Sequence, residues 1–299
     1  MKKFVLVTGV SSGIGYGIAH DLVSRGYHVL GSVRKESDGQ RLQAELGPAF
    51  TPLHFDVTDV AAIAVAVQQV GAIVGTHGLA GLVNNAGVSA TAPLMLQPLD
   101  EVRWIFEVNV IGVIAVTQAF LPLLGAREGA LHAPGRIVNI GSVGGMIAAP
   151  FMGAYAGTKH ALEAVTQVFR RELKIYGIEV SAVEPSFIKS EIYTKSATQS
   201  DVTRYDGTGF AAMWKAFLIS FMESERTADS VDLVTTAVYD ALTRKKPKTR
   251  YPLHPIWRIG QVLSDRQFDR LIFKVTGIDK VLRQKSAEAR AVADSRKSS

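Results

Sequence analysis

The chain has 299 residues, 47% of them apolar, with a formal net charge of +6 at pH 7 and no cysteine. This length and apolar content are enough for one large hydrophobic core or two modest ones. The absence of cysteine excludes disulfides, thiolate metal sites and a cysteine nucleophile, and it fits the reducing conditions of the cytoplasm, where we expect the protein. The basic residues do not alternate with aromatic ones as on a nucleic-acid-binding surface, so we expect no nucleic-acid partner.

The first residues, Met1 to Phe4, place two lysines before an apolar run, a start that a signal peptide also shows. The apolar run ends at Thr8 and Gly9, so we predict a strand and a turn here instead. No run of about 18 apolar residues occurs in the chain, and we predict no membrane-spanning helix.

Apolar strands and helical segments alternate from the N-terminus to residue 184. The strands are expected at 3–8, 27–33, 51–56, 79–84, 135–140 and 179–184. The helices are expected at 17–25, 38–46, 59–70, 100–124 and 154–176. Because the strands are continuous apolar runs, both faces of their sheet must be covered, as in a parallel sheet. The sequence therefore predicts an α/β protein with a Rossmann-type doubly wound parallel sheet, which binds ligands at the carboxyl ends of its strands.

The chain becomes irregular after residue 186. Residues 187–226 are expected to be an irregular lid, followed by a helix at 228–243 and a last strand at 249–253. We assign residues 1–255, lid included, to a single domain. The lid is rich in aromatic residues, which either line an apolar pocket or form a small core of their own, and the sequence leaves both interpretations open. These residues are Phe187, Tyr193, Tyr205, Phe210, Trp214, Phe217 and Phe221.

Residues 256–299 are expected to be a basic helical extension rather than an independent domain, with disorder over 291–299. Its apolar residues precede basic ones, a pattern that can contact an anionic lipid surface, although packing on the protein's own body or on another subunit is favoured. The apolar residues are Ile256, Trp257, Ile259, Val262 and Leu263, and the basic ones are Arg266, Arg270 and Lys274. We expect a homo-oligomer, either a dimer or a tetramer.

A glycine-rich loop follows the first predicted strand and precedes the first helix. It reads Thr8-Gly9-Val10-Ser11-Ser12-Gly13-Ile14-Gly15. Glycines let the backbone approach a pyrophosphate, and a helix N-terminus offers free N–H groups and the positive end of its dipole. Glycine spacing alone is a weak signal, but this position in the chain favours a dinucleotide-binding loop.

The spacing Gly-x3-Gly-x-Gly resembles the loop of the short-chain dehydrogenase/reductase family. Further matches follow in order over residues 3 to 190, each at a strand end or on the helix after it. They are Asp56-Val57, Asn84-Asn85-Ala86-Gly87, Asn109, Ser142, Tyr155 and Lys159. The resemblance implies an oxidoreductase that transfers a hydride between a nicotinamide dinucleotide and an alcohol/carbonyl pair. It also implies a catalytic set of Ser142, Tyr155, Lys159 and Asn109.

Tyr155 and Lys159 are four residues apart on a predicted helix, so their side chains share one face. A free tyrosine has a pKa of about 10, which is too high for a base near neutrality, and an adjacent ammonium lowers it. We therefore expect Lys159, together with an oxidised nicotinamide ring, to lower the pKa of Tyr155. The resemblance implies that Ser142 hydrogen-bonds the substrate oxygen and that Lys159 also holds the nicotinamide ribose. It implies that Asn109 positions a water that links the lysine to solvent.

The resemblance also marks residues expected to bind the cofactor, all at the ends of predicted strands or in the catalytic helix. They are Gly9, Ser11, Ser12, Gly13, Ile14, Gly15, Arg34, Asp56, Val57, Asn85, Ala86, Gly87, Tyr155, Lys159, Pro185, Ser186 and Ile188. The family often has Pro-Gly where this chain has Pro185 and Ser186. Serine holds most backbone conformations that need no positive φ, so the position is expected to keep its function.

The end of the second strand favours NADP(H) over NAD(H). Val33 takes the place of the acidic residue that holds a ribose hydroxyl, and Arg34 follows it. The planar fork of an arginine binds phosphate with two hydrogen bonds. Glu36 or Asp38 remain alternative partners for a ribose hydroxyl, in which case Arg34 is only solvated.

As a whole the chain resembles the 17β-hydroxysteroid and retinol dehydrogenase branch of the family, partly through Lys248-Thr249-Arg250-Tyr251 and the helical tail after it. This favours a lipophilic, steroid- or retinoid-like secondary alcohol, ketone or aldehyde as substrate, and the apolar Met146, Ile147 and Phe151 agree. Two alternatives stay open. One is NAD-dependent oxidation of a small polar alcohol, and the other is a catalytically silent cofactor-binding regulator.

Overall fold

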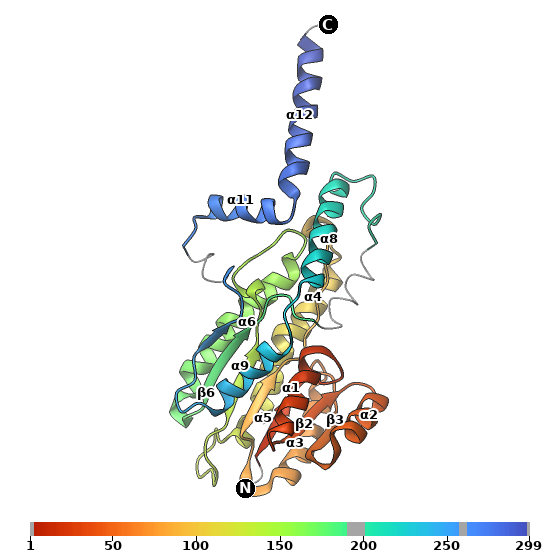
Figure 1. Ribbon diagram of the computed structural model, residues 1–299. Coiled ribbons are helices and arrows are strands. Elements are labelled where there is room, and N and C mark those ends of the chain that lie inside the picture. Colours follow the sequence, from red (N-terminus) through yellow and green to blue (C-terminus); the bar gives the residue numbers. More distant parts are fainter. Residues whose placement is uncertain (1–2, 190–200, 257–261, 298–299) are drawn as a thin grey trace.

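The computed structural model describes residues 3–189, 201–256 and 262–297, and within them seven parallel strands form one sheet (Figure 1). The order across the sheet is β3-β2-β1-β4-β5-β6-β7, so the direction of winding reverses between β1 and β4. The strands are β1 Phe4–Val7, β2 His28–Val33, β3 Phe50–His54, β4 Gly81–Asn84, β5 Arg136–Ile140, β6 Glu179–Glu184 and β7 Arg250–Pro252. This topology confirms the predicted doubly wound α/β fold.

Helices cover both faces of the sheet. The α-helices of the described residues are α1 Gly13–Ser24, α2 Glu36–Leu46, α3 Val60–Val74, α4 Leu99–Phe106, α5 Gly112–Phe120, α6 Gly153–Glu172, α8 Ala211–Arg226, α9 Asp232–Thr243, α11 Asp265–Val275 and α12 Ile278–Lys297. The helix expected at 100–124 is one continuous helical run that contains a π-helical turn at Glu107–Ile111 between α4 and α5. Asp59 caps α3 as expected, since its side chain accepts a hydrogen bond from the backbone N–H of Ala62.

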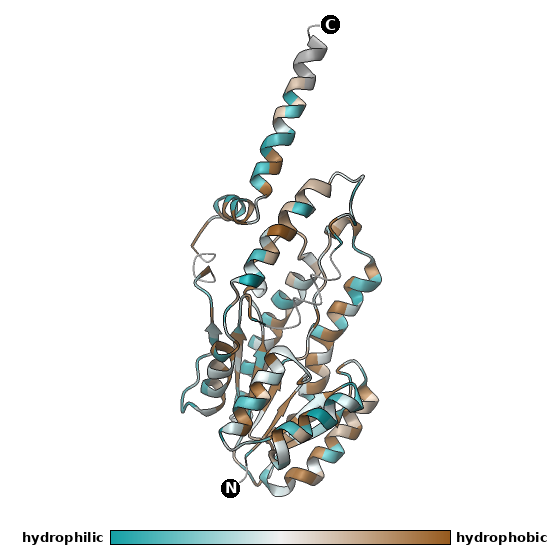
Figure 2. Ribbon diagram, turned by 45° about the vertical axis from the view of Figure 1, so that its right-hand side comes forward, coloured by the Kyte–Doolittle hydropathy of each residue, from teal (hydrophilic) through white to brown (hydrophobic). Residues whose placement is uncertain are grey.

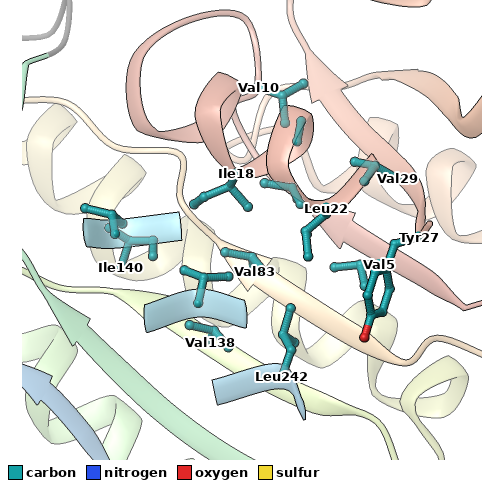
Figure 3. Close-up of a cluster of buried hydrophobic side chains, with 14 of the residues drawn as sticks. Val5, Val10, Ile18, Leu22, Tyr27, Val29, Val83, Val138, Ile140 and Leu242 are labelled. Carbon is teal, nitrogen blue, oxygen red and sulfur yellow. The ribbon is translucent and has the colours of Figure 1, made fainter. Parts of the chain in front are cut away.

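Alternate residues of each strand enter two separate hydrophobic cores. Val5 and Val7 pack with α1, α2 and α9 on one face, in the cluster that Figure 3 shows. Phe4 and Leu6 pack on the other face, in the cluster that holds the buried residues of α3 and α5. Because both sides of a strand are buried, both must be apolar, which is why the strands read as continuous apolar runs.

Two helical segments, Val60–His77 and Leu99–Leu124, are long and apolar enough to cross a membrane by length and composition alone. Neither segment was predicted from the sequence, because polar residues interrupt the apolar run in both. Both segments bury one side in the core below the sheet, through residues such as Ile63, Val70 and Phe120. This is the burial pattern of core helices in a globular domain.

Two expectations for the C-terminal part are wrong. The stretch 187–226, predicted to be irregular, contains the sixteen-residue helix α8, because its aromatic residues recur at helical spacing and bury one side. Residues 291–297, predicted to be disordered, continue α12. This helix extends away from the sheet and is largely hydrophilic (Figures 1 and 2), and i,i+4 contacts such as Arg283 with Asp279 support it.

The lid aromatics form a core of their own, the second of the two interpretations that the sequence left open. Trp214, Phe217 and Phe221 on α8 are buried against Tyr205 and Phe151. Of the lid residues named above, Tyr193 lies outside the described residues.

The tail packs against this lid core, as the favoured interpretation of the extension expected. Ile278 is fully buried in it, and the hydroxyl of Ser220 on α8 donates to the carbonyl of Val275. Trp257 and Ile259, two of the apolar residues expected to lead the tail, lie outside the described residues.

Phe151 joins the lid core to the segment that runs from Ser142 to Tyr155. Among the described residues, Phe151 is the one non-glycine residue with a positive φ, which is +67°. Such a conformation costs a bulky side chain about 1–3 kcal/mol unless the surroundings impose it. Its ring packs on Phe210, Trp214 and Phe217, and its carbonyl accepts a hydrogen bond from the backbone of Ala92. The lid core therefore holds this strained residue in place.

Replacing Trp214 by alanine is expected to destabilise the protein by about 3–5 kcal/mol, because the indole is 0% exposed and a cavity would remain. Urea unfolding followed by circular dichroism measures the change. Ile219→Ala is the control, since this residue lies on the same helix but is 71% exposed, and it should cost less than about 0.5 kcal/mol. Equal losses in the two variants would contradict a lid core centred on Trp214.

Candidate active site

The glycine loop after β1 has the shape that a dinucleotide requires. Gly9 and Gly13 have positive φ values of +70° and +60°. A Cβ atom on Gly15 would lie 2.2 Å from the carbonyl oxygen of Gly9, so only glycine fits. Among the described residues, no side chain caps the N-terminus of α1 and no acidic residue occupies its first turn. The free N–H groups there, next to Ser11, Ser12 and Ile14, fit a pyrophosphate.

The loop after β4 holds the glycine loop in this shape. The side chain of Asn85 donates hydrogen bonds to the carbonyls of Thr8 (2.9 Å) and Gly9 (3.1 Å). The hydroxyl of Thr8 accepts from the backbone N–H groups of Asn85 and Ala86, at 2.9 and 3.0 Å. The amide of Asn85 thus shapes the loop, while the backbone of Ala86 packs against Gly9 and Gly87 lies next to the amide of Asn109.

Two arginines lie where the adenosine end of a dinucleotide is expected. At the end of β2, Val33 is buried, and the side chain of Arg34 is 74% exposed, 3.8 Å from a carboxylate oxygen of Asp56. Arg41 on α2, which the sequence analysis missed, donates to the carbonyl of Ser11 at 2.7 Å. No sequence pattern connects Arg41 with the glycine motif, because α1 and β2 lie between them in the chain and only the fold brings them together.

The two acidic residues named as alternative ribose partners already have cationic or titratable neighbours. A carboxylate oxygen of Glu36 lies 3.1 Å from Nε2 of His54. A carboxylate oxygen of Asp38 lies 3.9 Å from the guanidinium of Arg41. Both carboxylates therefore already have partners, and each is less suited to bind a ribose hydroxyl than its sequence position indicated.

Ser142, Tyr155 and Lys159 come together beside the ends of β5 and β6. Ser142 follows β5, its side chain accepts from the backbone N–H of Gly144 at 3.0 Å, and it forms a hydrogen bond with Tyr155. The ammonium of Lys159 donates to the carbonyl of Ile140 at 2.9 Å and lies 5.7 Å from the centre of the Tyr155 ring. The structure therefore assembles these three members of the predicted catalytic set.

Burial dominates the acid–base properties of this group. It raises the pKa of Tyr155, and the hydrogen bond from Ser142 lowers it by less. Burial also lowers the pKa of Lys159, to about 8, and the carboxylate of Glu163 opposes part of this lowering. The sequence analysis expected a lowered pKa for Tyr155, and in the chain alone the shift has the opposite direction. The reason is that burial removes water from the phenol and so disfavours the charged phenolate, whereas the expectation also counted the positive charge of an oxidised nicotinamide.

Asn109 is buried in the π-helical turn, 1% exposed, and its amide is fully engaged. Its Nδ2 donates to the carbonyl of Val88 and to the hydroxyl of Thr158, and its Oδ1 accepts from the N–H of Val88. Thr158 in turn donates to the carbonyl of Tyr155 at 2.7 Å. Asn109 therefore ties the loop after β4 to the helix of Tyr155 and Lys159.

The remaining predicted cofactor residues lie along the same edge of the sheet. The carbonyl of Pro185 accepts from the N–H of Val143, which places the loop with Ser186 beside Ser142. Ile188 is buried and bridges to Asp229. After β3, Asp56 accepts from the backbone and hydroxyl of Thr58, and Val57 is buried.

The sequence analysis missed a group of buried charges behind Lys159. Glu163 on α6, Glu184 at the end of β6 and Arg250 on β7 contact one another there. The four-residue spacing of Lys159 and Glu163 was the available signal. Among the described residues, no group of three His, Asp or Glu is placed to hold a metal ion.

An open pocket of about 460 Å³ lies next to the segment between Ser142 and Tyr155. Most of its lining is apolar, and two carboxylates stand at its α11 side. The lining comprises Leu94, Met146, Ala148, Ala149, Pro150, Phe151, Gly153, Asp265, Phe268, Asp269, Ile272 and Phe273.

The doubly wound sheet, the glycine loop at its switch point and the Ser–Tyr–Lys group define a Rossmann-fold oxidoreductase that uses a nicotinamide dinucleotide. The family model of the short chain dehydrogenase matches residues 3–201. The chain belongs to the short-chain dehydrogenase/reductase family.

Several relatives match over most of their length. The chain is 37% identical to the NADPH-dependent 3-dehydrocapnine reductase of Ornithobacterium rhinotracheale, over 91% of this chain and 96% of the relative. It is 34% identical to human retinol dehydrogenase 16 and 32% identical to human 17-beta-hydroxysteroid dehydrogenase type 6, in each case over 83% of this chain and 80% of the relative. The resemblance to the hydroxysteroid and retinol dehydrogenase branch is thereby confirmed.

Solved structures agree with the fold. A short-chain dehydrogenase from Streptomyces avermitilis superposes with a TM-score of 0.70 at 27% identity, covering 95% of this chain and 98% of the other. A short-chain dehydrogenase/reductase from Burkholderia phymatum in complex with NAD has a TM-score of 0.73 at 24% identity, with coverages of 87% and 92%.

Gly15→Ala is expected to weaken binding of NADPH about tenfold to a hundredfold. The added methyl group would meet the carbonyl of Gly9 at 2.2 Å and Nδ2 of Asn85 at 2.4 Å. Overpacking of this kind costs about 1–3 kcal/mol, and about 1.4 kcal/mol corresponds to a factor of ten in affinity. Fluorescence titration measures the affinity. Gly209→Ala is the control, because its Cβ would meet open space; unchanged affinity in Gly15→Ala would argue against this loop as the nucleotide site.

Proposed function

We propose that this protein is an NADPH-dependent reductase of a lipophilic ketone or aldehyde. The observation that carries the proposal is the assembly of Ser142, Tyr155 and Lys159 at the carboxyl edge of the sheet, with the phenol in a poorly hydrated site. The 37% identity to a reductase that uses NADPH supports both the direction and the cofactor. A catalytically silent regulator is disfavoured, because it would have no need of this intact group.

Each residue has a role that its surroundings support. The hydroxyl of Ser142 hydrogen-bonds the substrate carbonyl, and Tyr155 donates a proton to the same oxygen as negative charge develops there. Lys159 holds the nicotinamide ribose, and its ammonium stabilises the phenolate that remains when Tyr155 has given up its proton. Bound NADPH supplies the hydride. Asn109 acts at a distance, because its amide positions the helix that carries both Tyr155 and Lys159.

The protonated state of Tyr155 in the chain alone suits carbonyl reduction. A phenol whose pKa lies above its ordinary value keeps its proton at neutral pH, and it therefore acts as a general acid. Alcohol oxidation needs the phenolate, which burial disfavours in the chain alone. A carbonyl substrate would therefore bind next to the protonated phenol, which is the form of Tyr155 that burial favours.

The adenosine end of the site supports NADPH. At the end of β2, Val33 offers no carboxylate, and the guanidinium of Arg34, 74% exposed and 3.8 Å from Asp56, is available to a 2′-phosphate. Arg41, anchored on the carbonyl of Ser11, adds a second cation beside the glycine loop. A carboxylate at this position would repel the phosphate, whereas two guanidiniums attract it.

The pocket beside the catalytic group supports a lipophilic substrate. Met146, Phe151 and Phe273 are among its lining residues, so apolar surface lies beside the segment that joins Ser142 to Tyr155. The lid aromatics do not contribute the pocket that the sequence analysis considered, because they are buried in their own core. The substrate class therefore rests on the residues between Ser142 and Tyr155 and on α11.

Tyr155→Phe is expected to lower the rate of NADPH-dependent carbonyl reduction by at least about a hundredfold, because general acid catalysis contributes about 10²–10⁴. NADPH oxidation is followed with a long-chain aliphatic ketone, a ketosteroid, a retinoid aldehyde and a short polar hydroxyketone. NADPH affinity should stay nearly unchanged, since only one hydroxyl is removed. Preference for the short polar ketone, or a rate in Tyr155→Phe close to that of the wild type, would refute the proposal.

Arg34→Ala is expected to weaken NADPH binding about tenfold or more and NADH binding little. A charge-assisted hydrogen bond contributes about 1.5–3 kcal/mol, and about 1.4 kcal/mol is a factor of ten. Both reduced cofactors are titrated into the wild type and the variant. Arg103→Ala, an exposed arginine on α4 that pairs with Asp100, is the matched control. Equal losses for the two cofactors would mean that Arg34 does not read the 2′-phosphate.

A further inference from the structure

Three charged side chains from three elements meet behind the catalytic lysine. Glu163 lies one helical turn after Lys159 on α6 and is 8% exposed, and Glu184 ends β6 and is 0% exposed. Arg250, at the start of β7, places its guanidinium 2.6 Å from Glu163 and 3.4 Å from Glu184. Two carboxyl groups and one guanidinium are thus enclosed within a few ångströms.

Arg250 brings the two carboxyl groups together, and Glu163 raises the pKa of Glu184 both by its charge and by hydrogen bonding to it. Since carboxylate oxygens only accept, such a contact requires a proton between them. No donor in the described chain reaches Oε2 of Glu184, which leaves that atom free for the proton. Burial and the neighbouring Glu163 raise the pKa of Glu184 to about 8, so the pair carries one negative charge at neutral pH.

The pair also adjoins the catalytic loop directly. A Cβ atom on Gly141 would lie 3.3 Å from Oε1 of Glu163, and one on Gly145 would lie 3.1 Å from its Cγ. These glycines flank the segment with Ser142, so the carboxyl pair packs against the loop that presents this serine. The titratable groups that act on the pair are Lys159 and Arg250, the first from its own helix and the second from the last strand.

We propose that Glu163 and Glu184 form a proton-sharing carboxyl pair that positions Lys159 and keeps its ammonium charged during turnover, with Arg250 as the anchor of the pair. The inference rests on the function proposed for Lys159. Burial lowers the pKa of Lys159 and so favours loss of its proton, and the carboxylate of Glu163 opposes that loss. A fully ionised pair would carry a second buried charge, and the shared proton avoids it.

The test is the pH dependence of reduction in Glu163→Gln. Removing the carboxylate lowers the pKa of Lys159, so the alkaline limb of the kcat profile should move to lower pH by about one unit or more. Well below this limb kcat should stay within about threefold of the wild type, since the lysine is charged there in both proteins. Glu179→Gln removes a carboxylate from the exposed start of the same strand, where it pairs with Lys174, and should leave the limb in place.

Glu184→Gln gives a second, independent readout in stability. The folded protein keeps the proton of Glu184 up to about pH 8, whereas an unfolded chain releases it near a pKa of about 4.3. Wild-type stability should therefore fall as pH rises through that window, and glutamine, which cannot ionise, should remove this part of the fall. The melting temperature of Glu184→Gln relative to that of the wild type should increase between pH 5 and pH 8.

The outcomes separate this inference from the proposed function. If Lys159→Ala retains activity, the function proposed for the lysine is wrong. If Lys159→Ala is inactive while Glu163→Gln keeps the wild-type alkaline limb, only the carboxyl pair is refuted. Should Glu163→Gln fail to fold, infrared spectroscopy of the wild type decides the matter. A protonated carboxyl band at neutral pH that disappears in Glu184→Gln supports the pair, and its absence in the wild type overturns it.

Discussion

The parallel register of the central strands is the constraint on which the active site depends. Hydrogen-bonded pairing aligns Val7 with Val83 and Asn84 with Asn139, and it aligns Ile140 with Val183. The central strands therefore end close to one line, and the residues that follow them fall at the same edge. A glycine loop, a polar amide and a serine meet there although long stretches of sequence separate them. The pairing of the strands therefore determines which residues come together at the active site.

Loss of hydration acts on three ionisable groups at this edge, and in each it disfavours the charged form. It disfavours the phenolate of Tyr155, the ammonium of Lys159 and the carboxylate of Glu184 alike. Coulombic contacts then decide how far each shift goes. The lysine keeps its proton to about pH 8 because a carboxylate stands one turn away, and Glu184 stays protonated to a similar pH. Burial and pairing together thus set proton affinities that no single residue has alone.

The sequence predicted the sheet and the catalytic group, because both depend on local patterns. Apolar runs marked the strands, and four-residue spacing put Tyr155 and Lys159 on one helical face. Arg41, Glu184 and Arg250 escaped prediction, since each reaches the site only through tertiary packing. In the chain alone the pKa of Tyr155 shifts upward for the same reason, whereas the expected lowering also counted the charge of an oxidised nicotinamide. A sequence shows the neighbouring charge but not how much water the fold removes.

The sequence analysis did not predict helix α8, although the aromatic residues of its segment recur at helical spacing. The same aromatics clamp Phe151 in its strained conformation, within the segment that ends in Tyr155. This connection has a consequence for engineering the enzyme. Substitutions in the lid core are expected to release Phe151 and so disturb the backbone that leads to Tyr155, although the lid aromatics themselves do not line the pocket. Changes made for stability in this core must therefore also be checked for their effect on turnover.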